Sequence, residues 1–243
     1  MRIVQITDLH INTTSETVNG IDTRANFIKT LNRAVSQNPD MLVLSGDLSF
    51  HSGNFEIYNW IKTVLKSKLL VDFHIIGGNH DDINTLAEVF ELKDRIRDDE
   101  LFYSIGEDIF FLDTIKGFCN HEQWNWFLEK ISGTTNEHPV IFMHHPPFKA
   151  GVPHMDNKYS FQQSDIFEKI IVESGKQPYV FCGHYHNEIT IARNGISVFI
   201  TPSTYLQISS ASEEFEIEHS IPAYRIIDID NNVLKTSVKY VFD

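Results

Sequence analysis

Short apolar runs alternate with amphipathic stretches over most of this chain. Within residues 23–37, Phe27, Leu31 and Ala34 recur at intervals of three or four, which predicts a helix with one buried face. Similar spacing predicts helices at residues 55–66, 121–131 and 164–175. The apolar runs between them predict strands at residues 2–7, 41–45, 71–76, 108–112, 139–143 and 179–182. Alternating strands and helices indicate a layered α/β domain with a largely parallel sheet.

The pattern changes after residue 188, where short strand-like runs follow one another without helices. Asn194-Gly195 separates two such runs and predicts a tight hairpin. Residues 223–230 and 233–242 predict a second pair of strands around Asn231-Asn232. The sequence contains no linker, repeat or low-complexity tract. We therefore expect one domain over residues 1–243, with the β-rich segment 187–243 as part of it.

Five of the apolar runs end in polar side chains that a hydrophobic core would reject. In chain order, these are Asp8 and His10; Asp47; Asn79, His80 and Asp81; His144 and His145; and His184 and His186. Ligands of open α/β sheets bind beyond the carboxyl ends of the strands, so this topology would bring all five clusters to one rim. Gly46, Gly78 and Gly183 directly precede three of them, and glycine permits a sharp turn and a close approach of the backbone.

The clusters combine carboxylates, an amide oxygen and at least four imidazoles. This mixed set suits divalent Mn, Fe, Co or Zn better than thiolate-bound zinc or an all-oxygen calcium site. Seven or eight ligands exceed what one such ion takes from protein. Two ions that share a bridging carboxylate fit better, and two-metal sites recur in enzymes that displace groups at phosphorus.

The remaining histidines are expected to have structural roles. They are His51, His74, His121, His138, His154 and His219. His51 and His154 are also candidates for substrate contacts, although an exposed loop position is the favoured interpretation for both.

Composition narrows the class of protein. A hydrophobic content of 42% and a charged content of 22% are typical of a globular domain. The net charge of −13 argues against a nucleic-acid binder, which would need clusters of Lys and Arg. No apolar run has the length of a membrane span and none reads as a signal peptide, so we expect a cytoplasmic protein without membrane association. Cys119 and Cys182 show no paired framework, and the β-rich end offers edges for a homodimer.

The ordered set D8-L-H10, G46-D47, G78-N79-H80-D81, H144-H145 and G183-H184-Y-H186 resembles the calcineurin-like metallophosphoesterase superfamily, with motifs that span residues 4–186. The resemblance implies a four-layer αββα sandwich with two mixed β-sheets and a dinuclear metal site at the carboxyl ends of the strands. By motif match, Asp8, His10 and His186 would bind one ion, and Asn79, His144 and His184 the other. Asp47 would bridge the two ions, and His80 would contact the phosphate or the leaving oxygen, supported by Asp81.

A narrower likeness extends beyond these motifs. Residues 19–27 (NGIDTRANF), 144–147 (HHPP), 200–207 (ITPSTYLQ) and 221–241 resemble bacterial class III cyclic-nucleotide phosphodiesterases. The likeness implies hydrolysis of cyclic AMP to 5′-AMP by a metal-bound hydroxide, with two divalent ions, of which Fe and Mn are favoured and Zn and Co are alternatives. His80 and Asp47 would be catalytic. The substrate would contact His10, Asp47, Asn79, His80 and His186.

Two other functions remain open at this point. The segment HHPPFKAGVPHMD, residues 144–156, also resembles the glycerophosphodiesterase branch, so another small phosphodiester or a phosphomonoester is the enzymatic alternative. A non-catalytic scaffold of the same fold would be expected to have lost ligands. Every ligand position is filled here, which favours an enzyme.

Overall fold

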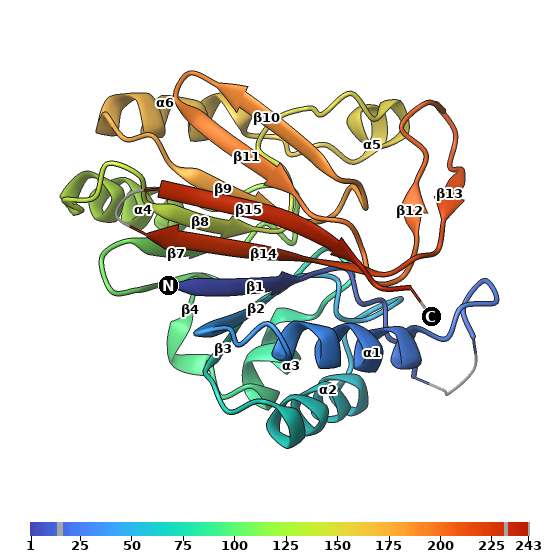
Figure 1. Ribbon diagram of the computed structural model, residues 1–243. Helices are drawn as coiled ribbons and strands as arrows, with labels where there is room; N and C mark the ends of the chain where they lie inside the picture. The colour runs from blue at the N-terminus through green and yellow to red at the C-terminus, as the bar shows by residue number, and fades with distance from the viewer. Residues whose placement is uncertain (14–16, 231–232, 243) are drawn as a thin grey trace.

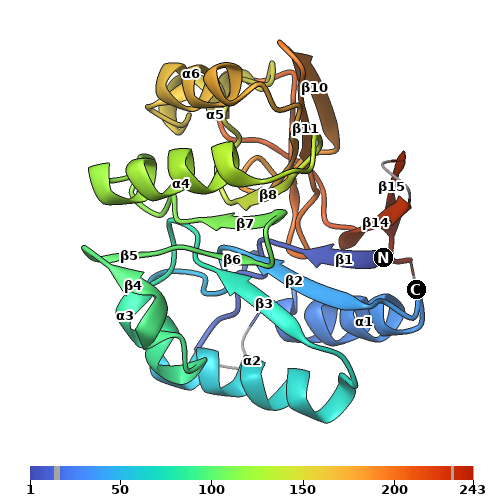
Figure 2. The same cartoon turned by 90° about the vertical axis from the view of Figure 1, so that its left-hand side faces the viewer.

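The computed structural model describes residues 1–13, 17–230 and 233–242, and it consists of two β-sheets stacked between two layers of helices (Figures 1 and 2). Each sheet has parallel strands at its centre and at least one antiparallel strand at an edge. The expected four-layer αββα sandwich with two mixed sheets is therefore confirmed.

The first sheet joins the two ends of the chain. In spatial order its strands are β15 (Val233–Tyr240), β14 (Ala223–Asp230), β1 (Arg2–Ile6), β2 (Met41–Ser45) and β3 (Phe73–Ile76). β1, β2 and β3 are parallel, whereas β14 pairs antiparallel with β1 and β15 with β14. The predicted turn at Asn231-Asn232 lies outside the described residues.

The second sheet is built from the middle of the chain. In spatial order its strands are β10 (Ile189–Arg193), β11 (Ile196–Ile200), β9 (Tyr179–Cys182), β8 (Val140–Met143), β7 (Ile109–Leu112) and β6 (Tyr103–Ile105). β7, β8, β9 and β11 are parallel, and the edge strands β6 and β10 are antiparallel. The hairpin between β10 and β11 turns at Asn194-Gly195, as the sequence predicted.

Helices cover the outer face of each sheet. On the first sheet lie α1 (Thr23–Val35), α2 (Phe55–Lys68) and α3 (Ile83–Val89), and on the second α4 (His121–Gly133), α5 (Pro153–Lys158) and α6 (Ser164–Ser174) (Figure 2). The other elements are η1 (Lys93–Arg95), the pair β4 (Ile96–Arg97) and β5 (Glu100–Leu101), and the pair β12 (Gln207–Ile208) and β13 (Ile217–His219).

Local sequence explains where these helices start. Asp22 caps α1 by accepting a hydrogen bond from the backbone N–H of Ala25, and Asn54 and Asn120 cap α2 and α4 in the same way. The sequence did not predict α3 or α5, since six or seven residues are too few to establish a helical period. The longest helix among the described residues, α2, has 14 residues, and no helix there is long and apolar enough to cross a membrane.

The alternation of side chains along β8 divides the core into two parts. Val140 and Phe142 pack in the cluster shared with the first sheet, whereas Ile141 and Met143 pack in the cluster that includes α4 and α6. Strands buried on both faces need continuous apolar runs, which is the pattern seen in the sequence. Cys119 and Cys182 are buried free thiols.

Candidate metal centre

The loops that follow β1, β2, β3, β8 and β9 meet at one end of the sandwich. Backbone hydrogen bonds join neighbouring loops: the N–H of Asp8 donates to Gly46 O (3.0 Å), and that of Gly183 to His144 O (3.0 Å). These contacts bring together two buried groups of metal-ligating side chains. One group contains Asp8, His10, Asp47 and His186, and the other Asp47, His144 and His184.

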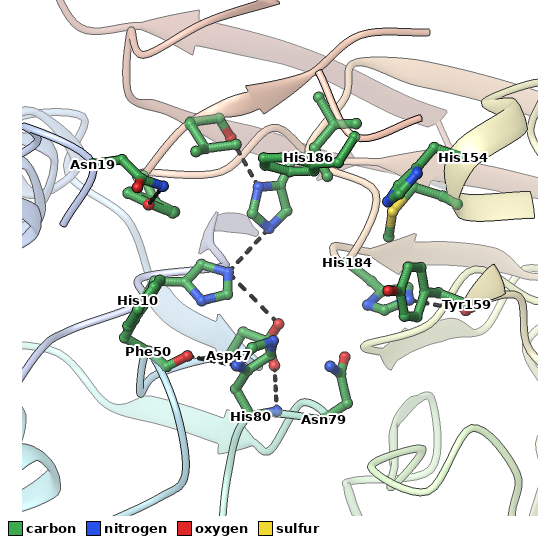
Figure 3. Close-up of a pocket in the computed structure, with 15 residues that line it drawn as sticks. His10, Asn19, Asp47, Phe50, Asn79, His80, His154, Tyr159, His184 and His186 are labelled. Carbon is green, nitrogen blue, oxygen red and sulfur yellow. Dashed lines mark hydrogen bonds and ion pairs between the residues drawn. The ribbon is translucent and has the colours of Figure 1, made fainter. Parts of the chain in front are cut away.

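The first group surrounds a point that four polar atoms face. His10 Nε2 lies 3.1 Å from His186 Nε2 and 3.6 Å from Asp47 Oδ2 (Figure 3). His186 Nε2 lies 3.3 Å from Asp8 Oδ1. His186 Nδ1 donates to the carbonyl of Leu206 (2.9 Å), so its Nε2 is the nitrogen available to a ligand. All four side chains are buried. Two imidazole nitrogens facing two carboxylates form an arrangement that suits a cation.

The second group shares Asp47 with the first. His144 donates its Nδ1 hydrogen to the carbonyl of Ser45 (2.9 Å), and its Nε2 lies 3.4 Å from Asp47 Oδ2. This buried Nε2 has no hydrogen-bond partner among the described residues. His184 Nε2 is 3.0 Å from the carbonyl of Tyr159, which leaves its Nδ1 for a ligand. Asn79 is exposed and lines a pocket that His184 also lines.

The pKa values of His144 and Asp47 show that the carboxylates and imidazoles of the two groups stabilise each other's charged forms. Burial alone would lower the pKa of His144, but the carboxylates of Asp47 and Asp8 outweigh it and raise the pKa to about 9. Burial would raise the pKa of Asp47, yet the neighbouring imidazoles, His144 foremost, hold it well below its ordinary value. The buried carboxylates therefore remain ionised, and positive charge beside them balances them. Together with the orphaned Nε2 of His144, this donor set fits two divalent ions.

Backbone geometry adds to this picture. Five residues of the two groups have positive φ angles: Asp8 (53°), His10 (46°), Asp47 (50°), His184 (66°) and His186 (53°). Residues other than glycine seldom adopt this left-handed conformation, and such strain, on the order of 1–3 kcal/mol each, gathers at functional sites.

Two glycines permit the close approach that the sequence predicted. A Cβ on Gly78 would collide with Asp47 Oδ1 and one on Gly183 with Asp8 Oδ2. Only glycine therefore lets these backbone segments pass so close to the carboxylates.

The structure corrects one expected contact. The carboxylate of Asp81 does not support the imidazole of His80; His80 Nδ1 instead lies 2.6 Å from the carbonyl of Phe50, and its backbone N–H donates to Asp47 Oδ1 (2.9 Å). The donors to Asp81 are the backbone N–H groups of Leu48 (3.1 Å), Ser49 (3.2 Å) and Gly78 (2.9 Å) and the hydroxyl of Tyr58 (2.9 Å). Asp81 thus joins the loops after β2 and β3, so it positions Asp47 and His80 indirectly.

A pocket of about 290 Å³ opens over both groups (Figure 3). Its floor includes His10, Asp47, Asn79, His80, His184 and His186. Its walls include Phe50, Met155, Tyr159, Tyr205, Ile208 and Phe215. Polar atoms that can hold ions and phosphate therefore lie beneath walls made largely of apolar and aromatic side chains.

His51 and His154, the two candidates for substrate contacts, lie in different environments. His154 lies in α5, is only 6% exposed and lines the pocket, so the expectation of an exposed loop position is wrong for it. Pro153 starts this short helix, and the side chain of the next residue, His154, is buried. His51 is exposed, as expected, and lies outside the residues that line the pocket.

Several pocket residues were not singled out from sequence. Asn19 donates a hydrogen bond to the hydroxyl of Tyr205 (2.7 Å), whose ring centroid is 5.4 Å from that of His10. Asn19 and Tyr205 belong to residues 19–27 and 200–207, two segments that resemble cyclic-nucleotide phosphodiesterases. That resemblance could have indicated both residues as part of the site. Tyr159 and Phe215 had no such signal, because neither belongs to a motif or to a regular hydrophobic pattern.

Comparison with known proteins agrees with this geometry. A model of the family described as calcineurin-like phosphoesterase matches residues 1–188. A probable cyclic nucleotide phosphodiesterase of Fibrobacter succinogenes is 33% identical over 99% of this chain and 94% of its own. The 3′,5′-cyclic adenosine monophosphate phosphodiesterase CpdA of Escherichia coli is 23% identical, covering 100% and 90%. A probable glycerophosphodiester phosphodiesterase, GpdQ, of Arcobacter nitrofigilis is 30% identical, covering 90% and 85%.

A solved structure extends the similarity to the fold. A dimetal phosphatase from Danio rerio superposes with a TM-score of 0.64 at 13% identity, covering 99% of this chain and 98% of that one. At this level of identity the similarity concerns the fold alone. The matched family model covers all five ligand clusters, and the described ligand groups supply a centre able to hold two metals. The chain therefore belongs to the calcineurin-like phosphoesterase family of metal-dependent hydrolases.

Proposed function

We propose that this protein is a phosphodiesterase that uses two divalent cations to hydrolyse 3′,5′-cyclic nucleotides, converting cyclic AMP to 5′-AMP. The observation that carries the proposal is a pocket with two groups of candidate metal ligands in its floor and aromatic side chains in its walls. The two groups share the carboxylate of Asp47. The floor suits a phosphodiester and the walls suit the nucleoside attached to it. Relatives named as cyclic-nucleotide phosphodiesterases over nearly the whole chain support this substrate class.

Each cation would be held by one ligand group. Asp8, His10 and His186 would hold one, Asn79, His144 and His184 the other, and Asp47 would serve both. When bound, two such ions neutralise phosphate oxygens and lower the pKa of a coordinated water. Fe and Mn suit these ligands best, with Zn and Co as alternatives.

The side chains of the chain have further roles in the reaction. Asp47 orients the loop after β3 by accepting the backbone N–H of His80, and the carbonyl of Phe50 fixes the imidazole of His80 through Nδ1. With Nδ1 engaged, Nε2 of His80 would be the atom that gives a proton to the leaving ribose oxygen. His10, Asn79 and His186, which also line the pocket, complete the proposed contacts with the substrate.

A glycerophosphodiester is the second candidate substrate. The relative named as a probable glycerophosphodiester phosphodiesterase covers 90% of this chain at 30% identity. The same floor would hold its phosphate, but its glycerol would leave the aromatic walls without a stacking partner. Wall chemistry therefore favours the cyclic nucleotide.

The test is a substrate panel with defined metals. The purified protein is stripped, reloaded with Mn, Fe, Zn or Co, and assayed on cyclic AMP, cyclic GMP, glycerophosphoethanolamine and p-nitrophenyl phosphate. We expect the highest kcat/KM for a cyclic nucleotide and the lowest for the monoester, whose dianion meets more repulsion from a chain of net charge −13. Efficient cleavage of glycerophosphoethanolamine with cyclic nucleotides untouched would assign the second candidate instead.

A further inference from the structure

One wall of the pocket is formed by α5 and the segment that precedes β13. His154 Nδ1 lies 3.3 Å from the carbonyl of Glu213, and Lys158 Nζ forms an ion pair with Glu214 (3.2 Å). These contacts hold the two segments together at the edge of the site. We call this part of the pocket the α5 wall and define it by His154, Met155, Tyr159 and Phe215, all of which line the pocket.

The α5 wall is attached directly to the second ligand group. The backbone carbonyl of Tyr159 lies 3.0 Å from His184 Nε2. Because this contact uses the main chain, the side chain of Tyr159 has no part in it. Figure 3 places His154 and Tyr159 on the same side of the pocket as His184, across from Asn19 and His10.

Two large aromatic rings of the α5 wall are open to solvent. Tyr159 is 49% exposed and Phe215 is 52% exposed. Their ring centroids lie 5.6 Å and 5.8 Å from that of His154, which is buried and lines the pocket. Exposed aromatic rings grouped beside a polar site are typical of ligand contacts.

The opposite wall offers less free aromatic surface. Tyr205 is only 4% exposed, its hydroxyl is bound by Asn19, and its ring packs at 5.8 Å from Phe50 and 5.4 Å from His10. Its faces are largely covered by protein. An aromatic ligand that needs a face on which to stack finds it on the α5 wall.

We infer that Tyr159 and Phe215 bind the base of the nucleotide substrate by stacking, an inference that rests on the proposed function. In a 3′,5′-cyclic nucleotide both ester oxygens belong to one ribose, so the base is the part that extends from the phosphate to a wall. Stacking on an aromatic side chain accepts any base, since every base has a π-face. The α5 wall therefore determines the preference for nucleotides over glycerol esters without strong selection among bases.

The test compares binding of a nucleotide with binding of phosphate alone. Tyr159→Leu, Phe215→Leu and the double variant are assayed for competitive inhibition by 5′-AMP and by inorganic phosphate, with bis(p-nitrophenyl) phosphate as the reporter substrate. Leucine keeps an apolar side chain but removes the ring. We expect the Ki of 5′-AMP to rise about tenfold for each single variant and more for the double variant, relative to the Ki of phosphate.

Phe55→Leu is the matched control. Phe55 is 56% exposed on α2 and does not line the pocket, so this change removes an equally exposed ring elsewhere. Its ratio of the two Ki values should equal that of the wild type. Unchanged ratios in the Tyr159 and Phe215 variants, or equal increases in both Ki values, would overturn the inference.

Failure of the proposed function has a different signature. A wild type that binds 5′-AMP through these rings and yet hydrolyses no cyclic nucleotide would support the base contact and reject the proposed substrate. If the wild type hydrolyses cyclic AMP and the ring variants keep the wild-type ratio of Ki values, the proposed function is supported and the base contact is rejected.

Discussion

Replacing Gly78 by alanine should disable the metal centre with a single methyl group. The new Cβ would collide with Asp47 Oδ1 and would lie 2.7 Å from His144 Nε2, whereas ordinary contact begins near 3.4 Å. The imidazole would therefore have to retreat by at least about 0.7 Å. It has little room to do so, because His144 is fully buried and its Nδ1 is held by the carbonyl of Ser45 at 2.9 Å.

The expected loss follows from that displacement. A shift of about 1 Å in catalytic geometry can cost on the order of 100-fold in rate, and overpacking a buried site costs about 1–3 kcal/mol of stability. Gly78 does not have a positive φ angle, so the effect is one of space and not of backbone strain. We expect weaker metal binding and a fall in kcat of about 100-fold in Gly78→Ala.

The assay measures metal content by elemental analysis, kcat on bis(p-nitrophenyl) phosphate, and urea unfolding. Gly133→Ala is the control, because its Cβ would meet nothing within 4 Å at the end of α4. That variant should keep its metals and gain about 0.4–1 kcal/mol of stability by restricting the unfolded chain. A Gly78→Ala protein with full metal content and more than half the wild-type rate would refute the steric reasoning.

Three further outcomes are expected. His80→Gln should retain its metals but lose about 10²–10⁴-fold on cyclic AMP and much less on bis(p-nitrophenyl) phosphate, whose leaving group needs no proton; equal losses would assign His80 to phosphate binding. Chelation should abolish hydrolysis, and full activity in protein shown to be metal-free would contradict the centre. Burial raises the pKa of Asp113 from 3.8 to about 6, so the native state binds the carboxyl proton more tightly than the unfolded state does. The stability that this protonation adds to the native state is lost as the pH rises from about 4 to 6. Relative to wild type, the free energy of unfolding of Asp113→Asn in urea should therefore increase by about 3 kcal/mol as the pH rises over that range. A difference between the two proteins that does not change with pH would contradict the raised pKa of Asp113.

The ligand clusters could be predicted because each follows a strand. Strand periodicity located the ends of β1, β2, β3, β8 and β9, and parallel topology implied a common rim. The pairing of β14 with β1 had no local signal, since it joins residues more than 200 positions apart. Sequence near either strand could not favour that partner over another.

The walls of the pocket could not be predicted for a different reason. The buried side chain of His154 belongs to a helix of six residues that begins at Pro153, and a helix this short leaves no period in the sequence. Asp81 follows His80 directly, yet its carboxylate serves the backbone of Leu48 and Gly78. Neighbours in sequence at a strand end point in different directions, so adjacency was a poor guide to contact.

The sharing of Asp47 has a thermodynamic consequence for metal loading. One carboxylate belongs to both ligand groups, so the first ion to bind would orient this side chain for the second and would withdraw part of its negative charge. The two binding equilibria would therefore be coupled. By linkage, the factor by which one ion changes the affinity for the other is the same in either order of addition. Partial loading should accordingly produce a distribution of empty, singly and doubly filled molecules that departs from independent binding, and activity should follow only the doubly filled fraction.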